Sequence, residues 1–294
     1  MLHISLIIPT FERPARLAEC LASLTETSHP AEALEVIVVD DGGRVPLDPV
    51  LAAFGDRLQT RLVRQTNAGP AAARNRGALE ARHPLLAFTD DDCRPASGWL
   101  SELAKTAERF PDAMIGGSTA NALADNVYSA ASQRLIDYIC EYYQPGSGRT
   151  PFFASNNMAV PAHRFHEIGG FDPSFPLAAG EDRDFCRRWY EAGFPMVAAP
   201  HAVIKHAHRL SLASFWRQHV NYGRGAYHYQ GKRHPPARPQ RPEPISFYLD
   251  LVTHPLRAKS GEKRLREAAL LAVSQIANVG GYTYEYLLAA SGRR

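Results

Sequence analysis

The sequence predicts an α/β fold built on a doubly wound, mostly parallel sheet, and two observations support this prediction. First, apolar runs rich in β-branched residues alternate with segments of helical periodicity. Second, most of these runs end in proline or acidic residues, which is typical of strands that stop at one edge of a sheet. Because ligands of such sheets bind beyond the carboxyl ends of the strands, the polar residues that follow the runs are candidates for a binding site.

The expected elements can be placed in chain order. The run from Ile4 to Ile8 is apolar apart from Ser5, as expected of a strand buried on both faces, and Pro70 stands in the favoured first turn of a helix. The expected strands are 4–8, 34–39, 58–63 and 85–88, with helices at 14–24 and 70–79. Later helices are expected at 99–110, 126–143, 181–192 and 212–229, and extended segments at 114–116, 152–160, 196–199 and 202–205.

The last part of the chain is expected to be a separate helical tail. A proline-rich segment at 234–244 suits neither a helix nor a central strand and therefore predicts a linker. Beyond it, residues 262–290 predict a weakly amphipathic helix, with a break expected at Gly280 and Gly281. Two alternatives stay open for this tail: it packs on the rest of the chain or on another subunit of a homo-oligomer, or it makes peripheral contact with an anionic membrane.

The composition argues against several classes of protein. A net charge of +3 over 294 residues is too small to indicate nucleic-acid binding. Four cysteines with no C-x-x-C pair are typical of reduced thiols. We find no basic leader with a secretory apolar stretch, and no run of the about 18 apolar residues that a membrane span needs. We therefore expect a cytoplasmic protein, peripheral on the inner face of the membrane if the tail binds lipid.

Three consecutive acids directly follow the apolar run at 84–88. Asp90, Asp91 and Asp92 would repel one another at the end of a buried strand unless a positive charge sits beside them. A divalent cation bound by hard oxygen ligands is the usual remedy, and such a cation in turn binds phosphate. The alternative is a solvated turn or a helix N-cap, because a Pro-Ala-Ser-Gly turn comes soon after.

Seven motifs in a characteristic order give the chain a resemblance to family-2 glycosyltransferases with the GT-A fold. The resemblance covers about residues 3–225. Each motif is weak alone, and their joint order is specific. They are Ser5-Leu6-Ile7-Ile8-Pro9-Thr10-Phe11, Val38-Val39-Asp40-Asp41-Gly42-Gly43, Asn67-Ala68-Gly69-Pro70-Ala71-Ala72-Ala73-Arg74-Asn75, Thr89-Asp90-Asp91-Asp92, Gly169-Gly170-Phe171-Asp172, Gly180-Glu181-Asp182 and Tyr222-Gly223-Arg224-Gly225.

The resemblance implies a donor site for a nucleotide-sugar, with UDP as the expected leaving group, in the first half of the chain. It implies that Asp41 accepts the imide N–H of uracil, although an Asp-Gly turn is the alternative role and suits Asp40 better. Arg74 is expected to reach the pyrophosphate, or else to be a solvated arginine. The further donor-site residues expected are Pro9, Thr10, Glu12, Asn67, Asp90 and Asp91.

The resemblance also implies a metal ion and a catalytic base. Asp92 is the expected direct ligand of Mn²⁺ or Mg²⁺, with His206 or His208 as a further ligand. Asp182, at the start of a predicted helix, is the expected base, and Glu181 its neighbour. Simple N-capping by an acid is the alternative for Asp182.

The sequence gives fewer indications of which residues bind the acceptor. Asn156 and Asn157 are expected to bind acceptor hydroxyls, with a structural turn as the alternative. Processive members of the family carry a Gln-x-x-Arg-Trp motif, and the segment 217–222 here has no Arg-Trp. The resemblance therefore implies transfer of a single sugar to a carbohydrate, lipid-linked or small-molecule acceptor, for example in the synthesis of cell-envelope polysaccharide.

The expected function is that of an inverting, metal-dependent glycosyltransferase. Its domains would be a catalytic domain at 1–230, a linker at 231–244 and a helical tail at 245–294. The catalytic domain would divide into a nucleotide-binding half, 1–95, and an acceptor-binding half, 96–230. Two alternatives are a sugar-phosphate nucleotidyltransferase, which would normally carry a glycine-rich loop absent from residues 9–14, and a non-catalytic subunit that binds sugar nucleotides.

Overall fold

The computed structural model describes residues 2–148, 151–175, 177–231, 243–257 and 264–291. The chain divides into two compact units. The first comprises Met1–Ala122, Tyr143–Ser174 and Asp182–Ala207, and the second Leu123–Tyr142, Phe175–Glu181 and His208–Arg294. The tail helices therefore cluster with two helices from the segment 96–230. Most of the expected linker, residues 232–242, lies outside the described residues.

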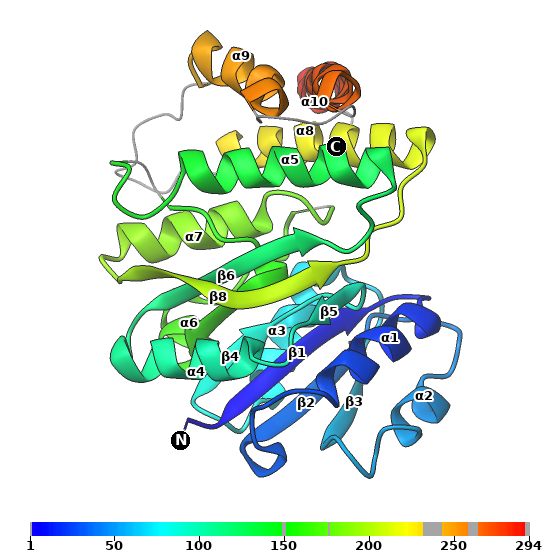
Figure 1. Cartoon of the computed structure of the whole chain (residues 1–294), viewed down its shortest axis with the longest axis vertical. Coiled ribbons are helices and arrows are strands. Elements are labelled where there is room, and N and C mark those ends of the chain that lie inside the picture. The colour runs from blue at the N-terminus through cyan, green and yellow to red at the C-terminus, as the bar shows by residue number, and fades with distance from the viewer. Residues whose placement is uncertain (1, 149–150, 176, 232–242, 258–263, 292–294) are drawn as a thin grey trace. The chain divides into compact units, whose positions relative to one another are not determined.

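The first unit is built on an eight-stranded mixed sheet (Figure 1). Its strand order is β3-β2-β1-β4-β7-β6-β8-β5. The strands β1 to β4 pair in parallel, as predicted, whereas β7 runs antiparallel to both β4 and β6, and β5 antiparallel to β8. The strands are β1 Ile4–Thr10, β2 Leu34–Asp40, β3 Thr60–Arg64, β4 Leu85–Phe88, β5 Cys93–Pro95, β6 Met114–Asn121, β7 Met158–Pro161 and β8 Met196–His206.

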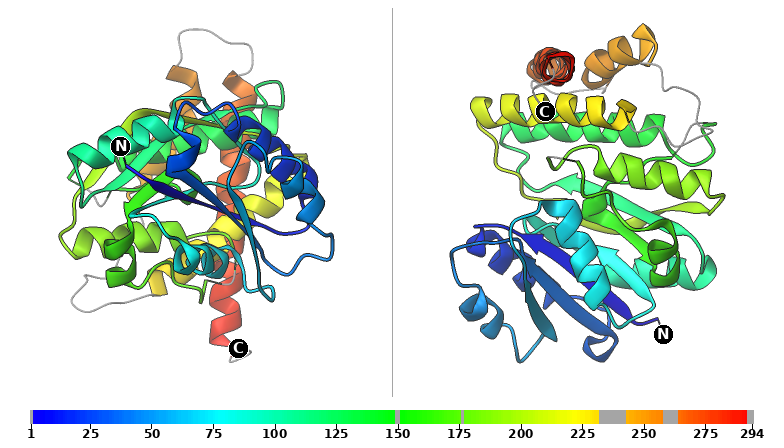
Figure 2. Two further views of the ribbon diagram at one scale, coloured as in Figure 1. Left: turned by 90° about the horizontal axis from the view of Figure 1, so that it is seen from below. Right: turned by 180° about the vertical axis from the view of Figure 1, so that it is seen from behind.

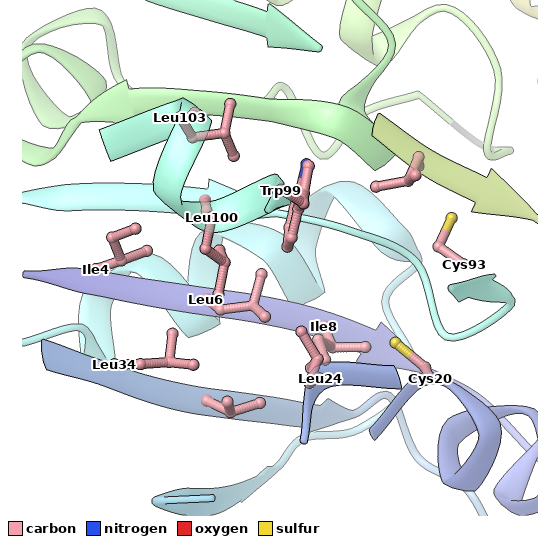
Figure 3. Close-up of a cluster of buried hydrophobic side chains, with 14 of the residues drawn as sticks. Ile4, Leu6, Ile8, Cys20, Leu24, Leu34, Cys93, Trp99, Leu100 and Leu103 are labelled. Atoms are coloured by element: carbon pink, nitrogen blue, oxygen red, sulfur yellow. The ribbon is translucent and has the colours of Figure 1, made fainter. Parts of the chain in front are cut away.

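Helices cover both faces of this sheet and bury its central strands completely. On one face, Ile4, Leu6 and Ile8 pack with α1 and α4 (Figure 3). On the other face, Ile7 packs in a cluster with residues of α3, α6 and α7. Because both faces of β1 are buried, apolar residues fill adjacent positions of the strand instead of alternating with polar ones, and its polar Ser5 and Thr10 are buried as well. The helices of this unit are α1 Pro14–Leu24, α2 Asp48–Ala52, α3 Pro70–Glu80, α4 Trp99–Arg109, α6 Ala162–Ile168 and, from its second residue on, α7 Glu181–Glu191.

The second half of the sheet differs from the prediction in three places. The two short strands expected at 196–199 and 202–205 are one strand, β8, whose register with β6 shifts between Gly117 and Ser118. This irregularity needs Gly117, because a Cβ there would clash with the carbonyl oxygen of Ala202. The extended segment expected at 152–160 contains a 3₁₀ turn at Ser155–Asn157 before β7 begins. Strand β5 was not predicted, because three residues are too few to show a period.

The second unit consists of helices. They are α5 Val127–Tyr142, α8 Leu212–Gly231, α9 Ile245–Thr253 and α10 Arg264–Ala290, with a 3₁₀ turn at His254–Arg257. Helices α5 and α8 form one layer, and α9 and α10 lie beside each other in the next (Figures 1 and 2). The break expected at Gly280 and Gly281 is wrong, because α10 is continuous. A Cβ at Gly281 would clash with the backbone of Val220, so this glycine serves the close approach of α10 to α8.

Among the described residues, none of the helices has the length and the apolar composition that a membrane span requires.

Candidate active site

The three acids that follow β4 are each paired with a guanidinium group in the first unit. Arg74 donates to Asp90 at 2.7 Å, Arg13 lies 2.9 Å from Asp91, and Arg16 donates to Asp92 at 3.0 Å. Arg13 is the N-cap residue of α1, and Arg16 lies in the first turn of that helix. This arrangement follows from the sheet order, because β1 and β4 are neighbours and α1 begins just beyond the end of β1.

The middle acid of the trio, Asp91, is buried, and burial disfavours its ionised form. Asp91 is fully buried, and its Oδ2 accepts a hydrogen bond of 2.7 Å from the hydroxyl of Thr10. Burial raises the pKa of Asp91 from 3.8 to about 6, against the opposing effects of Arg13 and Thr10. Thr10, expected in the donor site, thus holds an acid of that site in place. Pro9 lies within β1, and Glu12 instead accepts the backbone N–H of Arg44 at 2.6 Å.

The last acid of the trio lies beside a histidine from the end of β8. The Nε2 atom of His206 is 3.1 Å from Oδ1 of Asp92, and this contact raises the pKa of His206 although burial acts to lower it. Neighbouring ligands at about 2.1 Å from an octahedral ion lie about 3 Å apart, so this pair of donors fits a divalent cation.

The thiol of Cys93 is the third group near Asp92 and His206, and the donor atoms of all three lie within 4.8 Å of one another. Burial raises the pKa of Cys93 well above 9.0, which keeps it a thiol. The remaining donors are a hard carboxylate and a borderline imidazole; the carboxylate suits Mn²⁺ and Mg²⁺, and the imidazole would coordinate in its neutral form. His208, the other candidate ligand, belongs to the second unit, where its carbonyl oxygen accepts the hydroxyl of Ser129.

Arg74 contacts one acid of the trio and acts electrostatically on the expected base. It is buried on α3, where its guanidinium stacks over the ring of Phe171 at 5.6 Å and contacts Asp90. Asp182, near the start of α7, accepts the N–H of Arg183 at 2.8 Å. Burial raises the pKa of Asp182, and Arg74 acts in the opposite direction. Arg74 thus contacts Asp90 directly and acts electrostatically on Asp182.

The loop after β2 holds a carboxylate that is already largely satisfied. Asp41 is buried and accepts three hydrogen bonds: from Gln65 Nε2 at 2.7 Å and from the backbone N–H groups of Ala68 and Gly69, both at 2.9 Å. A carboxylate has about four acceptor positions, so one remains. Asn67 donates to the carbonyl oxygen of Asp41 and so fixes the loop.

The structure corrects the role expected for Asn157. Its side chain is buried and makes three internal hydrogen bonds: it accepts Trp99 Nε1 at 2.7 Å and donates to the carbonyl oxygens of Ser118 and Ala202. An amide engaged in this way ties β6 and β8 together and has no donor left for an acceptor sugar. Asn156 is half-buried, with Thr119 Oγ1 at 3.5 Å from its Oδ1.

Two further outcomes concern the expected site residues. Asp40 shapes the Asp-Gly turn, as predicted, by accepting the N–H of Gly43 at 2.8 Å. Glu181 is buried in the second unit, and its role beside Asp182 stays a prediction.

Arg13 and Arg16 were not predicted from the sequence as site residues. Two basic residues three positions apart, soon after the first strand, are a signal that could have indicated them.

The fold and these side chains define an α/β protein whose acids, histidine and arginines gather beyond the carboxyl ends of parallel strands. The chain matches the model of glycosyl transferase family 2 over residues 5–166, more than half its length. It also matches glycosyl transferase family group 2 over residues 86–284. The chain therefore belongs to glycosyl transferase family 2.

Individual relatives agree with this assignment. The chain is 28% identical over 245 residues to validoxylamine A glucosyltransferase of Streptomyces hygroscopicus subsp. jinggangensis, a match that covers 71% of this chain and 58% of that protein. It is 28% identical over 239 residues to pre-mycofactocin glycosyltransferase of Mycobacterium tuberculosis, covering 76% and 46%. The chain thus spans about half the length of the curated relatives it matches.

Solved structures share the fold. The mannosyltransferase PcManGT of Pyrobaculum calidifontis, in complex with GDP-Man and Mn²⁺, aligns with a TM-score of 0.60 at 19% identity, covering 99% of this chain and 80% of that one. Residues 1–349 of S. aureus TarS, in complex with UDP-GlcNAc, align with a TM-score of 0.55 at 14% identity, covering 99% and 92%. Both neighbours thus contain a nucleotide-sugar on the same fold.

Proposed function

We propose that this protein is an inverting, non-processive glycosyltransferase that moves one sugar from a nucleotide-sugar to an acceptor hydroxyl. The observation that supports this most is that Arg74, a phosphate-binding group, pairs with Asp90 of the acid trio and also acts electrostatically on Asp182, the proposed proton acceptor. The relatives and solved neighbours named above add the nucleotide-sugar chemistry.

The donor diphosphate is proposed to take over the guanidinium groups that now pair with the acids. Arg13 and Arg16 are each partly exposed, so their side chains can turn from Asp91 and Asp92 toward an incoming diphosphate. Arg74 is buried and fixed by Phe171, so it would bind a phosphate in place. A planar guanidinium suits two phosphate oxygens at once.

Asp92 and His206 are the proposed ligands of Mn²⁺ or Mg²⁺. When bound, the ion would neutralise charge on the departing nucleoside diphosphate. We further propose UDP as the leaving group, because the remaining acceptor position of Asp41 suits the single imide N–H of uracil.

Asp182 is proposed to act as the general base. Its carboxylate takes the proton of the acceptor hydroxyl while that oxygen forms a bond to the anomeric carbon and the bond from this carbon to the phosphate oxygen breaks. A single displacement inverts the anomeric configuration. Because burial raises the pKa of Asp182, its carboxylate is a stronger base than an exposed aspartate.

The test measures the release of nucleoside diphosphate from UDP-sugars by the wild type, Asp182→Asn and Glu191→Gln, each with and without Mn²⁺. Asp182→Asn keeps the size of the side chain and removes the base, so turnover should fall by about 100-fold or more. Glu191→Gln, an exposed residue at the far end of α7, is the matched control and should retain full activity.

The same assay separates the alternatives. A sugar-phosphate nucleotidyltransferase would release pyrophosphate from a nucleoside triphosphate, and a non-catalytic subunit would show no turnover in any of the three proteins. Either result, or an unchanged rate in Asp182→Asn, would reject the proposal.

A further inference from the structure

Helix α10 exposes a largely apolar face. Residues 268–284 contain no Asp, Glu, Lys or Arg. One face of α10 is fully buried against α8 and α5 through Leu271, Ser274 and Ala277. The opposite face leaves Leu265 74% and Ile276 63% exposed. A contiguous apolar surface of this kind is typical of an interaction site, so we expect a partner to cover this second face.

Two buried acids fix which face of α10 points outward. Glu267 pairs with Arg134 of α5 at 3.3 Å, and Glu285 pairs with Arg224 of α8 at 2.6 Å. The two acids are 18 residues apart, which is about five helical turns, so they lie on the same side of α10. Ion pairs at both ends therefore prevent rotation of α10 about its axis, and the apolar face opposite them stays exposed.

The exposed face has the periodicity of a coiled-coil seam. From Leu265 to Ala290, apolar or small residues recur at alternating spacings of four and three, with Ile276, Val279 and Tyr286 as the other large members. We call this set, positions 265, 269, 272, 276, 279, 283, 286 and 290, the outer stripe. A repeat of 3.5 residues is typical of a helix that packs against another long helix.

We propose that the outer stripe is a homodimer interface in which α10 packs antiparallel against α10 of a second copy of this chain. This inference does not rest on the proposed function, because no outer-stripe residue belongs to the candidate active site.

The order of large and small residues along the stripe favours the antiparallel arrangement. With a two-fold axis between positions 277 and 278, Leu265 meets Ala290 of the partner subunit, and Ala269 meets Tyr286 of the partner subunit. In both of these pairs a large side chain thus faces a small one, which favours close packing. A parallel pair would instead set Tyr286 against its own copy and leave a gap at Ala269.

In the same register, the central residues of the outer stripes of the two copies also face each other. Ala272 meets Thr283 of the partner subunit, and Ile276 meets Val279 of the partner subunit. The two-fold axis therefore passes between two of the largest exposed apolar groups, where an isologous interface has its most buried contacts.

The available area reaches that of a biological interface. The stripe is about 38 Å long and about 10 Å wide, or about 400 Å² per copy. Helix α9, beside α10, adds Ile245 and Leu249, which are also exposed and four residues apart. With these two side chains, the two copies together would bury more than the about 1,000 Å² of total area that a biological interface needs.

A membrane surface is the less suitable occupant. Helices that lie on anionic lipid carry lysine and arginine along the edge of their apolar face. On α10 the borders of the stripe carry no charge between Arg266 and Ser291, apart from the buried Glu267 and Glu285.

Size-exclusion chromatography with light scattering tests the proposal on the full chain. Wild type should have twice the 32.4 kDa mass of one chain at micromolar concentration. Ile276→Glu should be monomeric, with a dimer dissociation constant raised at least about 100-fold, because the symmetric interface loses two buried isoleucines. Leu79→Glu is the matched control: it is 70% exposed on α3 of the first unit and should stay dimeric.

Disulfide cross-linking tests the register. In a mixture of Ala272→Cys and Thr283→Cys chains, the two variants should cross-link to each other, whereas a parallel dimer would cross-link each variant to itself. Circular dichroism confirms that the variants fold. A monomeric wild type, a dimer unaffected by Ile276→Glu, or flotation of the monomer with anionic phosphatidylglycerol vesicles that Ile276→Glu abolishes would overturn the proposal, the last in favour of lipid.

Discussion

Replacing Asp91 by asparagine should change how the stability of the protein depends on pH. Asp91 is buried beside the cationic Arg13, and burial raises its pKa from 3.8 to about 6. The folded protein therefore holds the proton of this carboxyl more tightly than the unfolded chain does. The resulting stabilisation is fully present below pH 3.8 and is lost as pH rises through about 6.

The size of the effect follows from these two pKa values. One pKa unit corresponds to 1.36 kcal/mol, and at about pH 5 the folded state is mostly protonated at Asp91 while the unfolded state is mostly ionised. This carboxyl therefore contributes about 1.4 kcal/mol more stability at about pH 5 than at about pH 8. Asp91→Asn cannot titrate, so the variant should lack this part of the pH dependence.

Urea unfolding measures the difference, with EDTA present so that no metal ion binds. Trp99 and Trp189 are buried in the first unit, so tryptophan fluorescence reports on the part of the chain that holds Asp91. Asp48→Asn is the control, because Asp48 is exposed and its pKa is lowered by Arg64, so it stays ionised over this range. If wild type and Asp91→Asn lose the same free energy of unfolding between the two pH values, the reasoning is refuted.

Three further predictions concern the site. Arg74→Lys should raise the KM for the donor at least about 10-fold in steady-state kinetics, because a lysine cannot hold two phosphate oxygens from a fixed plane; an unchanged KM would contradict the role of Arg74. The acid limb of kcat/KM should have its midpoint above 3.8, the ordinary pKa of aspartate, because the pKa of Asp182 is raised and the base works only when ionised; a midpoint at or below 3.8 would count against it. Asn157→Ala should lower the free energy of unfolding by about 3 kcal/mol in urea titrations, because it leaves the N–H of Trp99 and two carbonyl groups unpaired; a loss below about 1 kcal/mol would show that the amide is dispensable.

Much of the first ninety residues could be predicted from sequence because its determinants are local. The buried strands β1, β2 and β4 are runs of adjacent apolar residues with few polar ones, and the sheet order of a doubly wound fold then brings their ends together. The positions of Asp41, Asp90 and Asp92 at those ends follow from the same pattern.

The rest of the site depends on contacts between distant segments. Arg13 reaches Asp91 only because β1 lies beside β4, and nothing in the local sequence states which strands are neighbours. Asn157 was assigned to the acceptor because an asparagine pair in a turn looks the same whether its amides face a ligand or the inside of the sheet. Its three partners come from α4, β6 and β8.

The structure of the helical tail also depends on a contact with a distant segment, which the local sequence does not reveal. Two consecutive glycines predict a helix break, because glycine is a poor helix former. In the structure the helix continues, and Gly281 allows the backbones of α10 and α8 to approach closely. Only the packing partner distinguishes a glycine that ends a helix from one that lets two helices meet.

The proposed transfer reaction depends most on Asp92, His206 and Arg74 together binding the diphosphate end of a nucleotide-sugar. A crystal structure of the protein with UDP and Mn²⁺, measured at the manganese absorption edge, tests this most directly. We expect one anomalous peak, from a manganese ion bound to Asp92 and His206, with the diphosphate in contact with Arg74. A manganese peak elsewhere, or a diphosphate remote from Arg74, would contradict it.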